Sequence, residues 1–266
     1  MTDSATFQRF TDPALWDAYW QGMELPAEVS KSDSLLVEAL TDVFDQHVPL
    51  TSGNNVLEIG GSSGRYLVYL QRRSGCTVHV LESSPVGCEA ARRNFELLGV
   101  SGEVTYGDMF DDAIVLPPMD VVYSLGLIEH FDDPATVAAA HLRFLKPGGT
   151  LVIGAPNLAG INRLLFTRLS PSVYEWHDAR SADPASWVPF ERDNRLEPVF
   201  KGYIGGFDPT LFWRVDRDRK TDVAIALTLK QLGGLLNRPS ARVVRRANRR
   251  AWSAYAIAVY RAPGQT

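Results

Sequence analysis

Cysteine is rare in this chain: only two of the 266 residues, Cys76 and Cys88, are cysteines. Two cysteines supply neither a disulfide framework nor the ligand set of a structural zinc site. We therefore expect reduced structural thiols, as in a protein of the cytoplasm, and no bound metal.

Long apolar runs and an excess of positive charge are also missing. No window approaches the roughly 18 apolar residues of a transmembrane helix, and residues 1–10 lack the basic and then apolar run of a signal peptide. The 27 Lys and Arg against 31 Asp and Glu argue against a dedicated nucleic-acid-binding protein. We expect a cytoplasmic monomer or homodimer that neither enters membranes nor binds nucleic acid.

The most informative stretch of the sequence is residues 56–70. Residues 56–59 are apolar around Glu58, and residues 65–70 suit a helix. Between them lies a loop of small residues: Gly60, Gly61, Ser62, Ser63 and Gly64. A strand, a glycine turn and a helix form the first half of a nucleotide-binding βαβ unit. Glycine opens backbone torsions that are closed to other residues and lets a ligand lie on the main chain.

Acidic residues follow the next two predicted strands. Residues 77–81 form a short apolar strand that ends at Glu82, where a carboxylate can reach the two ribose hydroxyls of a nucleoside. We favour ribose binding over a glutamate placed there by chance. Residues 103–106 lead to Asp108, which suits either the adenine amino group or an ordinary turn.

Short apolar strands alternate with helices along the first 157 residues. Further strands are predicted at 120–124 and 150–157, with a helix from Asp133 to Leu145 and a sharp turn at 146–149 between them. This alternation predicts an α/β fold with a doubly wound, mostly parallel sheet. Ligands bind such sheets at the carboxyl ends of the strands, where Glu58, Glu82 and Asp108 should meet.

The glycine spacing excludes two common nucleotide sites. It fits neither the dinucleotide fingerprint nor a P-loop, and Glu58 would repel a pyrophosphate but suits a cationic ligand. Residues 56–157 resemble a class I S-adenosylmethionine-dependent methyltransferase of the bacterial small-molecule type. The matching blocks are residues 56–64, 80–82, 107–109, 120–131 and 145–157, with Ser62 in place of the usual middle glycine.

The resemblance implies S-adenosylmethionine as cofactor and a Rossmann-like sheet of seven strands in the order 3-2-1-4-5-7-6, the last antiparallel. The glycine loop would pass beneath the methionine moiety, with Glu58 near its ammonium. Glu82 would bind the ribose, Asp108 the adenine, and residues 124–127 would lie beside the sulfonium. The residues that we expect around the cofactor are Tyr19, Trp20, Glu58, Gly60, Gly61, Ser62, Gly64, Glu82, Ser83, Asp108, Met109, Ser124, Leu125 and Leu127.

The N-terminal region predicts two helices. Asp12 and Pro13 are typical of a helix start, and Trp16, Tyr19 and Trp20 then share one face. The helix is either a lid over the cofactor or an aromatic helix packed on the domain. A second helix is predicted at 32–47. We divide the chain into a helical lid (1–50), a cofactor-binding core (51–157) and an acceptor-site insertion that also completes the sheet (158–266).

The C-terminal third departs from a minimal methyltransferase. About forty aromatic-rich residues separate strand five from a sixth strand near 198–204, and we expect a long irregular insertion over the acceptor site. Residues 222–238 predict an amphipathic helix for the core or a subunit interface, and 254–261 the closing strand. Within Arg242–Arg250, arginines 242, 245, 246, 249 and 250 would share one helical face, either solvated or facing an anionic acceptor.

The expected reaction is an in-line displacement at a sulfonium, for which the protein mainly orients the two reactants. A general base is needed only for a weakly acidic hydroxyl or a protonated amine, and His130 and His177 are the candidates. The leading hypothesis is methyl transfer to oxygen or nitrogen of a small metabolite. Its alternatives are a C-methyltransferase, a cyclopropane-type lipid enzyme, or an inactive cofactor-binding regulator or partner.

Overall fold

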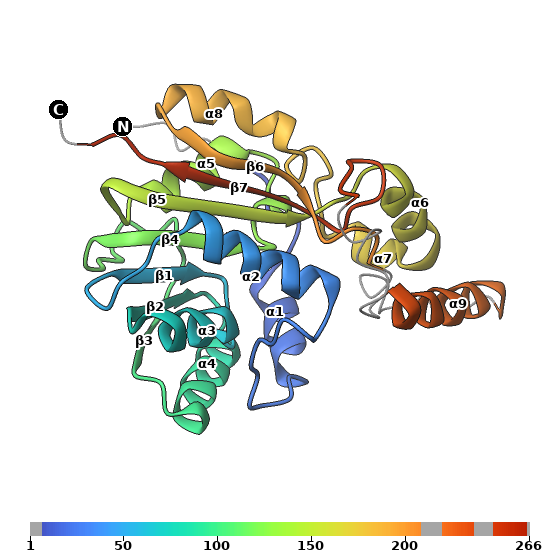
Figure 1. The fold of residues 1–266 in the computed structure, drawn as a ribbon, viewed down its shortest axis with the longest axis horizontal. Coiled ribbons are helices and arrows are strands. Elements are labelled where there is room, and N and C mark those ends of the chain that lie inside the picture. Colours follow the sequence, from blue (N-terminus) through green and yellow to red (C-terminus); the bar gives the residue numbers. More distant parts are fainter. Residues whose placement is uncertain (1–6, 209–219, 237–246, 265–266) are drawn as a thin grey trace.

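A computed structural model describes residues 7–208, 220–236 and 247–264. Its centre is one seven-stranded sheet in the order β3-β2-β1-β4-β5-β7-β6 (Figure 1). The strands are β1 (Asn55–Ile59), β2 (Thr77–Glu82), β3 (Gly102–Tyr106), β4 (Met119–Leu125), β5 (Leu145–Pro156), β6 (Glu197–Ile204) and β7 (Tyr255–Arg261). Strands β1 to β5 pair in parallel, whereas β7 runs antiparallel to both β5 and β6. The predicted fold class and strand order are confirmed.

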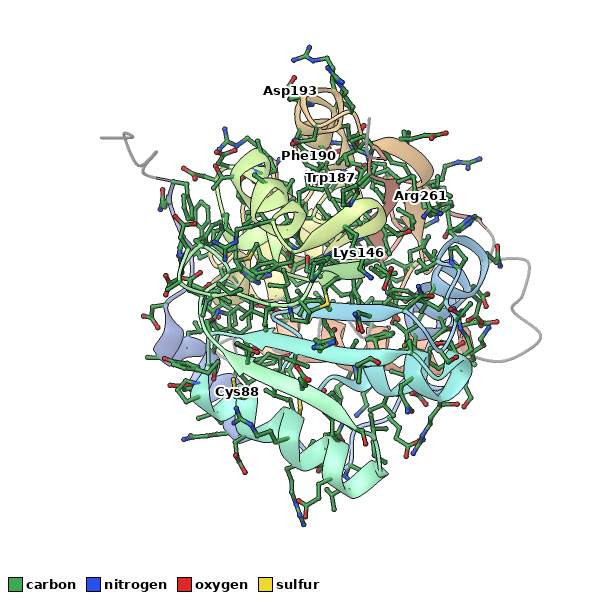
Figure 2. The ribbon with its side chains drawn as sticks, turned by 90° about the vertical axis from the view of Figure 1, so that its left-hand side faces the viewer. Cys88, Lys146, Trp187, Phe190, Asp193 and Arg261 are labelled. Carbon is green, nitrogen blue, oxygen red and sulfur yellow. The ribbon has the colours of Figure 1, made fainter. Side chains whose placement is uncertain are left out.

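Helices cover both faces of the sheet. They are α1 (Pro13–Gln21), α2 (Leu35–His47), α3 (Arg65–Ser74), α4 (Pro85–Leu98), α5 (Pro134–Leu142), α6 (Gly160–Leu169), α7 (Pro171–Tyr174), α8 (Val188–Asp193) and α9 (Lys220–Leu236), with short 3₁₀ turns η1 (Ile128–His130) and η2 (Pro184–Trp187). Successive strand residues point to opposite faces, so Val56 packs with α2 to α4 and Leu57 with α5 to α8. Both cysteines are buried free thiols: Cys76 belongs to the apolar layer of α2 to α4, and Cys88 lies on α4 (Figure 2).

Local capping chemistry sets two helix starts where the sequence predicts them. The Asp12 side chain accepts from the Leu15 N–H at 2.8 Å, and the Ser84 hydroxyl accepts from the Gly87 N–H at 2.9 Å. Each cap is followed by proline, whose missing N–H costs nothing at the first helical position. Helix α4 ends at Gly99, which takes the left-handed conformation with φ +65°.

The segment at the start of β5 combines the predicted turn with strand pairing. Helix α5 ends at Leu142 and β5 begins at Leu145, earlier than predicted. The register with β4 jumps from Met119 opposite Leu145 to Val121 opposite Thr150, so residues 146–149 bulge out of that pairing, with Gly148 at φ +73°. The Gly148 N–H donates to Pro263 O at 2.9 Å, which keeps the bulge within the sheet.

The insertion between β5 and β6 is mostly helical, so the prediction of a long irregular segment was also wrong. It contains α6, α7, η2 and α8. Trp187 and Phe190 lie fully buried at its base against the sheet (Figure 2), and the Trp187 indole N–H donates to Ser181 O at 2.8 Å. The aromatic residues of this segment therefore supply a core of their own for short helices.

Helix α9 projects away from the sheet layers beyond α6 (Figure 1). Ile225 and Leu232 of its apolar stripe are each 38% exposed, which contradicts packing of the whole stripe in the core. Arg249 and Arg250 lie in non-helical chain, so they do not share a helical face, and arginines 242, 245 and 246 lie outside the described residues. None of the helices that the structure describes combines the length and apolarity needed to cross a bilayer.

Candidate functional site

A cleft lies at the carboxyl ends of β1 to β4, and the segment that leads into α1 forms one of its walls. Its cavity volume is about 60 Å³ in this conformation. The strand ends contribute Ile59, Gly60, Leu81, Ser83, Gly107, Asp108, Met109 and Leu127, and the N-terminal segment contributes Arg9, Thr11 and Trp16. This is the edge at which doubly wound sheets bind their ligands.

The glycine loop takes its shape from backbone torsions that favour glycine. Gly60 has φ +71° and donates its N–H to Leu81 O at 2.9 Å, and Gly64 begins α3 with φ +62°. A Cβ on Gly61 would lie 2.1 Å from the Glu58 carboxyl carbon, so the loop passes directly over that side chain. Ser62, with φ +25°, takes a backbone conformation that is costly for a residue with a side chain.

Glu58 is buried beneath this loop. Burial raises the pKa of its carboxyl to about 8, and the hydroxyl of Tyr123 and the charge of Arg65 oppose that rise. Within the described residues, neither Glu58 Oε2 nor the Ser62 hydroxyl has a hydrogen-bond partner. A buried carboxyl under a glycine loop is suited to the ammonium group of a cationic ligand.

Glu82 ties the glycine loop to the start of α4. Its Oε1 accepts from the Ser84 N–H at 2.8 Å and its Oε2 from the Ser62 N–H at 3.3 Å. Burial raises the pKa of Glu82, and these N–H groups oppose the rise. Ser83 lines the cleft, whereas the Glu82 carboxylate lies behind it, held by the backbone. Glu82 therefore holds the glycine loop against the start of α4 in this conformation.

Asp108 faces an arginine that the sequence did not single out. Its Oδ2 lies 2.6 Å from Arg9 Nη1, and its Oδ1 accepts from the Phe110 N–H at 3.0 Å. The Arg9 guanidinium also lies 5.0 Å from the centre of the Phe110 ring. Arg9 stands alone in the sequence, without a periodic or motif signal, and only tertiary packing brings it to the predicted adenine residue. Met109 lies buried beside this pair and also lines the cleft.

The first helix contacts the cleft through a different aromatic residue from those predicted. Trp16 lines the cleft and meets the His130 ring edge-on at 5.0 Å. Trp20 stacks on Trp16 at 6.0 Å and packs against Gly87 of α4, and Tyr19 is 38% exposed. Neither Tyr19 nor Trp20 forms the cleft wall. Helical spacing identified the aromatic face but not which ring points inward.

The segment after β4 contributes one of its three predicted residues to the cleft. Leu127 lines the cleft, and its Cδ1 lies 3.2 Å from where a Cβ on Gly60 would stand. The buried Ser124 hydroxyl instead pairs with His141 Nε2 at 2.9 Å. Leu125 packs with the apolar layer of α2 to α4.

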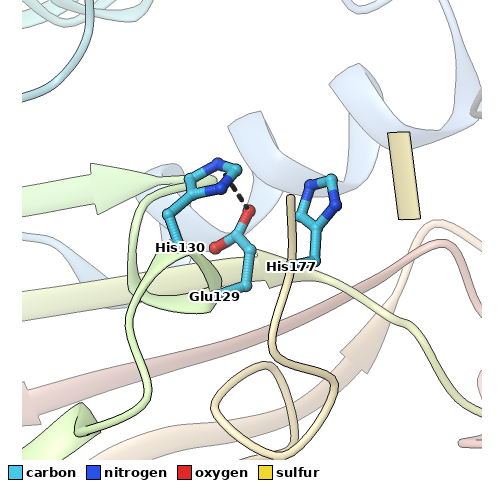
Figure 3. Close-up of side chains that lie close together, drawn as sticks. All are labelled: Glu129, His130 and His177. Atoms are coloured by element: carbon cyan, nitrogen blue, oxygen red, sulfur yellow. Dashed lines mark ion pairs between the residues drawn. The ribbon is translucent and has the colours of Figure 1, made fainter. Parts of the chain in front are cut away.

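The structure brings the two candidate bases together. His130 lines the cleft at the end of η1, and His177 follows α7 with its ring centre 4.8 Å from that of His130 (Figure 3). Burial lowers the pKa of His130 to about 3 and that of His177 to about 4. Both imidazoles are therefore neutral at physiological pH. The sequence offered no signal for this pairing, which depends on how the insertion packs on η1.

The cleft residues fit S-adenosylmethionine. The left-handed Gly60 lets a ligand approach the main chain closely, while Glu58 lies buried beneath the loop, outside the cleft lining. Ser83 and Asp108 provide polar groups at successive strand ends, and Leu127 provides an apolar wall.

Comparison with known proteins supports the same assignment. Residues 33–202 match the family model described as a methyltransferase domain. A dimethylglycine N-methyltransferase of Parasynechococcus marenigrum is 29% identical over 66% of this chain and 65% of its own length. A ubiquinone biosynthesis O-methyltransferase of Thiobacillus denitrificans is 32% identical over 58% of this chain and 68% of its own length. In the first of these and in two further ubiquinone biosynthesis O-methyltransferases, the match spans 56–65% of the relative, less than two thirds.

Solved structures share the fold at low sequence identity. A methyltransferase of Thiobacillus denitrificans in complex with S-adenosyl-L-homocysteine has a TM-score of 0.55 at 18% identity, over 94% of this chain and 99% of its own. A geranyl diphosphate C-methyltransferase of Streptomyces coelicolor A3(2) has a TM-score of 0.54 at 12% identity, over 85% and 78%. The family match covers most of the chain and the fold agrees with it. The chain belongs to the methyltransferase-domain family and has the seven-stranded fold of the solved S-adenosylmethionine-dependent methyltransferases.

Proposed function

We propose that this enzyme transfers the methyl group of S-adenosylmethionine to an oxygen or nitrogen of a small-molecule acceptor. The observation that carries the proposal is that one cleft joins the strand ends of the donor site to a neutral histidine, His130. N- and O-methyltransferases among the relatives support this chemistry. The proposal keeps the division into a lid (1–50), a core (51–157) and an acceptor-site region (158–266), and keeps a cytoplasmic location.

The donor would be held by the strand ends. The glycine loop and Glu58 take the methionine moiety, Glu82 and Ser83 the ribose, and Asp108 and Met109 the adenine. The cofactor supplies a methyl group activated on a sulfonium. In this conformation Arg9 forms an ion pair with Asp108. Binding of the adenine by Asp108 therefore requires that this ion pair open and that the N-terminal segment move.

His130 is the better placed of the two candidate bases. Its Nδ1 lies 2.7 Å from Trp176 O, and because a carbonyl only accepts, Nδ1 carries the proton. The lone pair on Nε2 can accept a hydrogen bond from an acceptor hydroxyl or amine and orient it, whereas a pKa of about 3 makes Nε2 a weak base at neutral pH. Trp16, Leu127 and Phe131 form the walls beside it, which suits an acceptor with an apolar or aromatic body.

An anionic acceptor receives less support. Of the arginines predicted to bind one, Arg250 already pairs with Asp183 at 2.6 Å, and Arg249 Nη1 donates to the carbonyl of Asn248. A C-methyltransferase is the second candidate, because a structural neighbour is a C-methyltransferase. Transfer to an alkene would leave a carbocation that must lose a C–H proton, and the neutral His130 could take that proton after the transfer.

The test has two steps: calorimetry for cofactor binding, and transfer of a labelled methyl group for activity. Titration with S-adenosyl-L-homocysteine should show one site per chain, and no heat with either it or S-adenosylmethionine would contradict the proposal. A methyl-labelled donor is then incubated with fractionated small-molecule extracts. Label lost on mild base hydrolysis indicates a methyl ester, whereas methyl ethers, methylamines and C-methyl products keep it and are distinguished by the carbon-13 chemical shift of the labelled methyl group. A protein that binds donor but labels no fraction would be the inactive regulator.

A further inference from the structure

Three potential metal ligands meet beside the cleft. Glu129 and His130 lie in η1 after β4, and His177 comes from the insertion after α7 (Figure 3). One ligand atom from each lies within 4.8 Å of the others. The backbone fixes this meeting, since the Asp178 N–H donates to Glu129 O at 2.6 Å.

Hydrogen bonds to backbone carbonyls set the tautomer of both histidines. His130 Nδ1 lies 2.7 Å from Trp176 O, and His177 Nδ1 lies 2.7 Å from Val173 O. Both Nδ1 atoms must donate, which leaves the lone pair of each ring on Nε2. Metal-binding histidines are typically held in this way, with the second nitrogen donating to a carbonyl or carboxylate. Burial also keeps both imidazoles neutral, as ligation requires.

Glu129 supplies the carboxyl ligand. The residue is 1% exposed, and within the described residues no donor contacts Oε2. Its Oε1 lies 3.8 Å from His130 Nε2, too far for a hydrogen bond. A buried carboxyl oxygen without a donor is costly, and a bound cation would hold the group as a carboxylate and remove that cost.

We propose that Glu129, His130 and His177 bind a divalent transition-metal ion. Two imidazoles and one carboxylate favour ions such as zinc, manganese or iron over magnesium and calcium, which prefer oxygen ligands. Bonds of roughly 2.1 Å hold any two ligand atoms within about 4.2 Å, so the cluster must contract slightly from 4.8 Å. His177 is only partly buried and can make this adjustment.

The site would bear directly on the acceptor. Three protein ligands leave coordination positions open, and His130 lines the cleft, so an open position faces the acceptor side. An acceptor hydroxyl bound there would lose its proton more readily. This role rests on the proposed methyl transfer, whereas metal binding does not.

The experiment uses the full chain after chelator treatment. Titration with Co²⁺ should give visible absorption bands that saturate at one ion per chain, and Zn²⁺ should displace it in calorimetry. Glu129→Gln and His177→Ala should each weaken Zn²⁺ binding at least tenfold. His47→Ala is the matched control, because His47 stacks on Phe200 in another part of the fold and should leave affinity within twofold.

Two outcomes would overturn the metal site. One is an absence of saturable Co²⁺ bands and Zn²⁺ heat in the wild type, which needs no variant to be folded. The other is unchanged Zn²⁺ affinity in both cluster variants, with circular dichroism confirming their fold. Binding of S-adenosyl-L-homocysteine is measured on the same samples. Retained cofactor binding without metal binding refutes only the metal site, and the reverse refutes only the proposed function.

Discussion

The donor side and the acceptor side of the cleft are built by different means. On the donor side, a few neighbouring residues suffice: left-handed Gly60 and Gly64 shape the loop, and Glu82 holds it through backbone N–H groups. On the acceptor side, His130 and His177 come from separate segments and are fixed by carbonyls of the insertion. Donor recognition is therefore encoded in short motifs, and acceptor chemistry in packing between distant segments.

The largest expected effect tests whether the donor loop depends on packing as well as on torsions. Gly64→Ala places a methyl group 2.7 Å from the Phe95 ring at φ +62°. The left-handed torsion costs about 1–2 kcal/mol and the overpacking about 1–3 kcal/mol. We expect the free energy of unfolding in urea to fall by about 3 kcal/mol.

Gly99→Ala is the matched control for this loss. Its φ is +65°, and nothing lies within 4 Å of the added methyl group, so only the torsional cost of about 1 kcal/mol remains. Equal losses in the two variants would show that contact with Phe95 is unimportant. The donor side would then depend on backbone torsion alone.

The second effect is on cofactor affinity. Glu82→Ala removes the acceptor of the Ser62 and Ser84 N–H groups, each a hydrogen bond to a charged group worth about 1.5–3 kcal/mol. We expect the affinity for S-adenosyl-L-homocysteine to fall at least about 100-fold in calorimetry. Asp183→Ala, on the acceptor side, should leave it unchanged. A loss below threefold for Glu82→Ala, in a folded protein, would refute its role.

The donor side could be predicted because its signals act over a few residues. Asp12 and Ser84 cap helices three positions away, and Gly60 and Gly64 specify their own torsions. Alternation of strands and helices then restricts the topology to very few possibilities. These features predicted a doubly wound sheet and the position of the cleft, whereas the strand order followed from the family resemblance.

The rest depended on contacts that no local pattern specifies. The Arg9 contact with Asp108 and the inward position of Trp16 arise when the N-terminal segment folds over a finished sheet. The meeting of His130 with His177 depends on how the insertion packs against η1. The turn predicted at residues 146–149 could likewise not be recognised as a bulge of β5, because the Gly148 N–H donates to Pro263 O, more than 100 positions later.

The third effect asks whether Glu129 titrates as a buried acid. Burial raises the pKa of its carboxyl to about 8 from an ordinary value of 4.5, so the folded state keeps a proton that the unfolded state has lost. The associated stability is present at acid pH and disappears as pH rises through this range. Between pH 6.5 and 8.5 the metal-free wild type should lose up to about 2 kcal/mol more than Glu129→Gln.

Urea unfolding at both pH values, with chelator present, measures this difference. Glu103→Gln is the control, because its side chain is 71% exposed and the variant should follow the wild type. Parallel pH dependence of Glu129→Gln and the wild type would mean that Glu129 is ionised in the folded protein. The acceptor side would then contain an ionised, buried Glu129 carboxylate.

The smallest expected effect concerns the ion pair between Asp183 of the insertion and Arg250, which precedes β7. Arg250 Nη2 lies 2.6 Å from Asp183 Oδ2, but the arginine side chain is 63% exposed. Exposed pairs contribute less than about 1 kcal/mol, and Asp183 keeps the Ala185 N–H and the Tyr203 hydroxyl as partners. Arg250→Ala should therefore lower the free energy of unfolding by less than about 1 kcal/mol, a difference that shrinks in 1 M salt. Cofactor affinity should not change. A loss above 2 kcal/mol, or weaker cofactor binding, would show that the insertion and the donor loop are energetically coupled. The donor and acceptor sides of the cleft would then not be independent of each other.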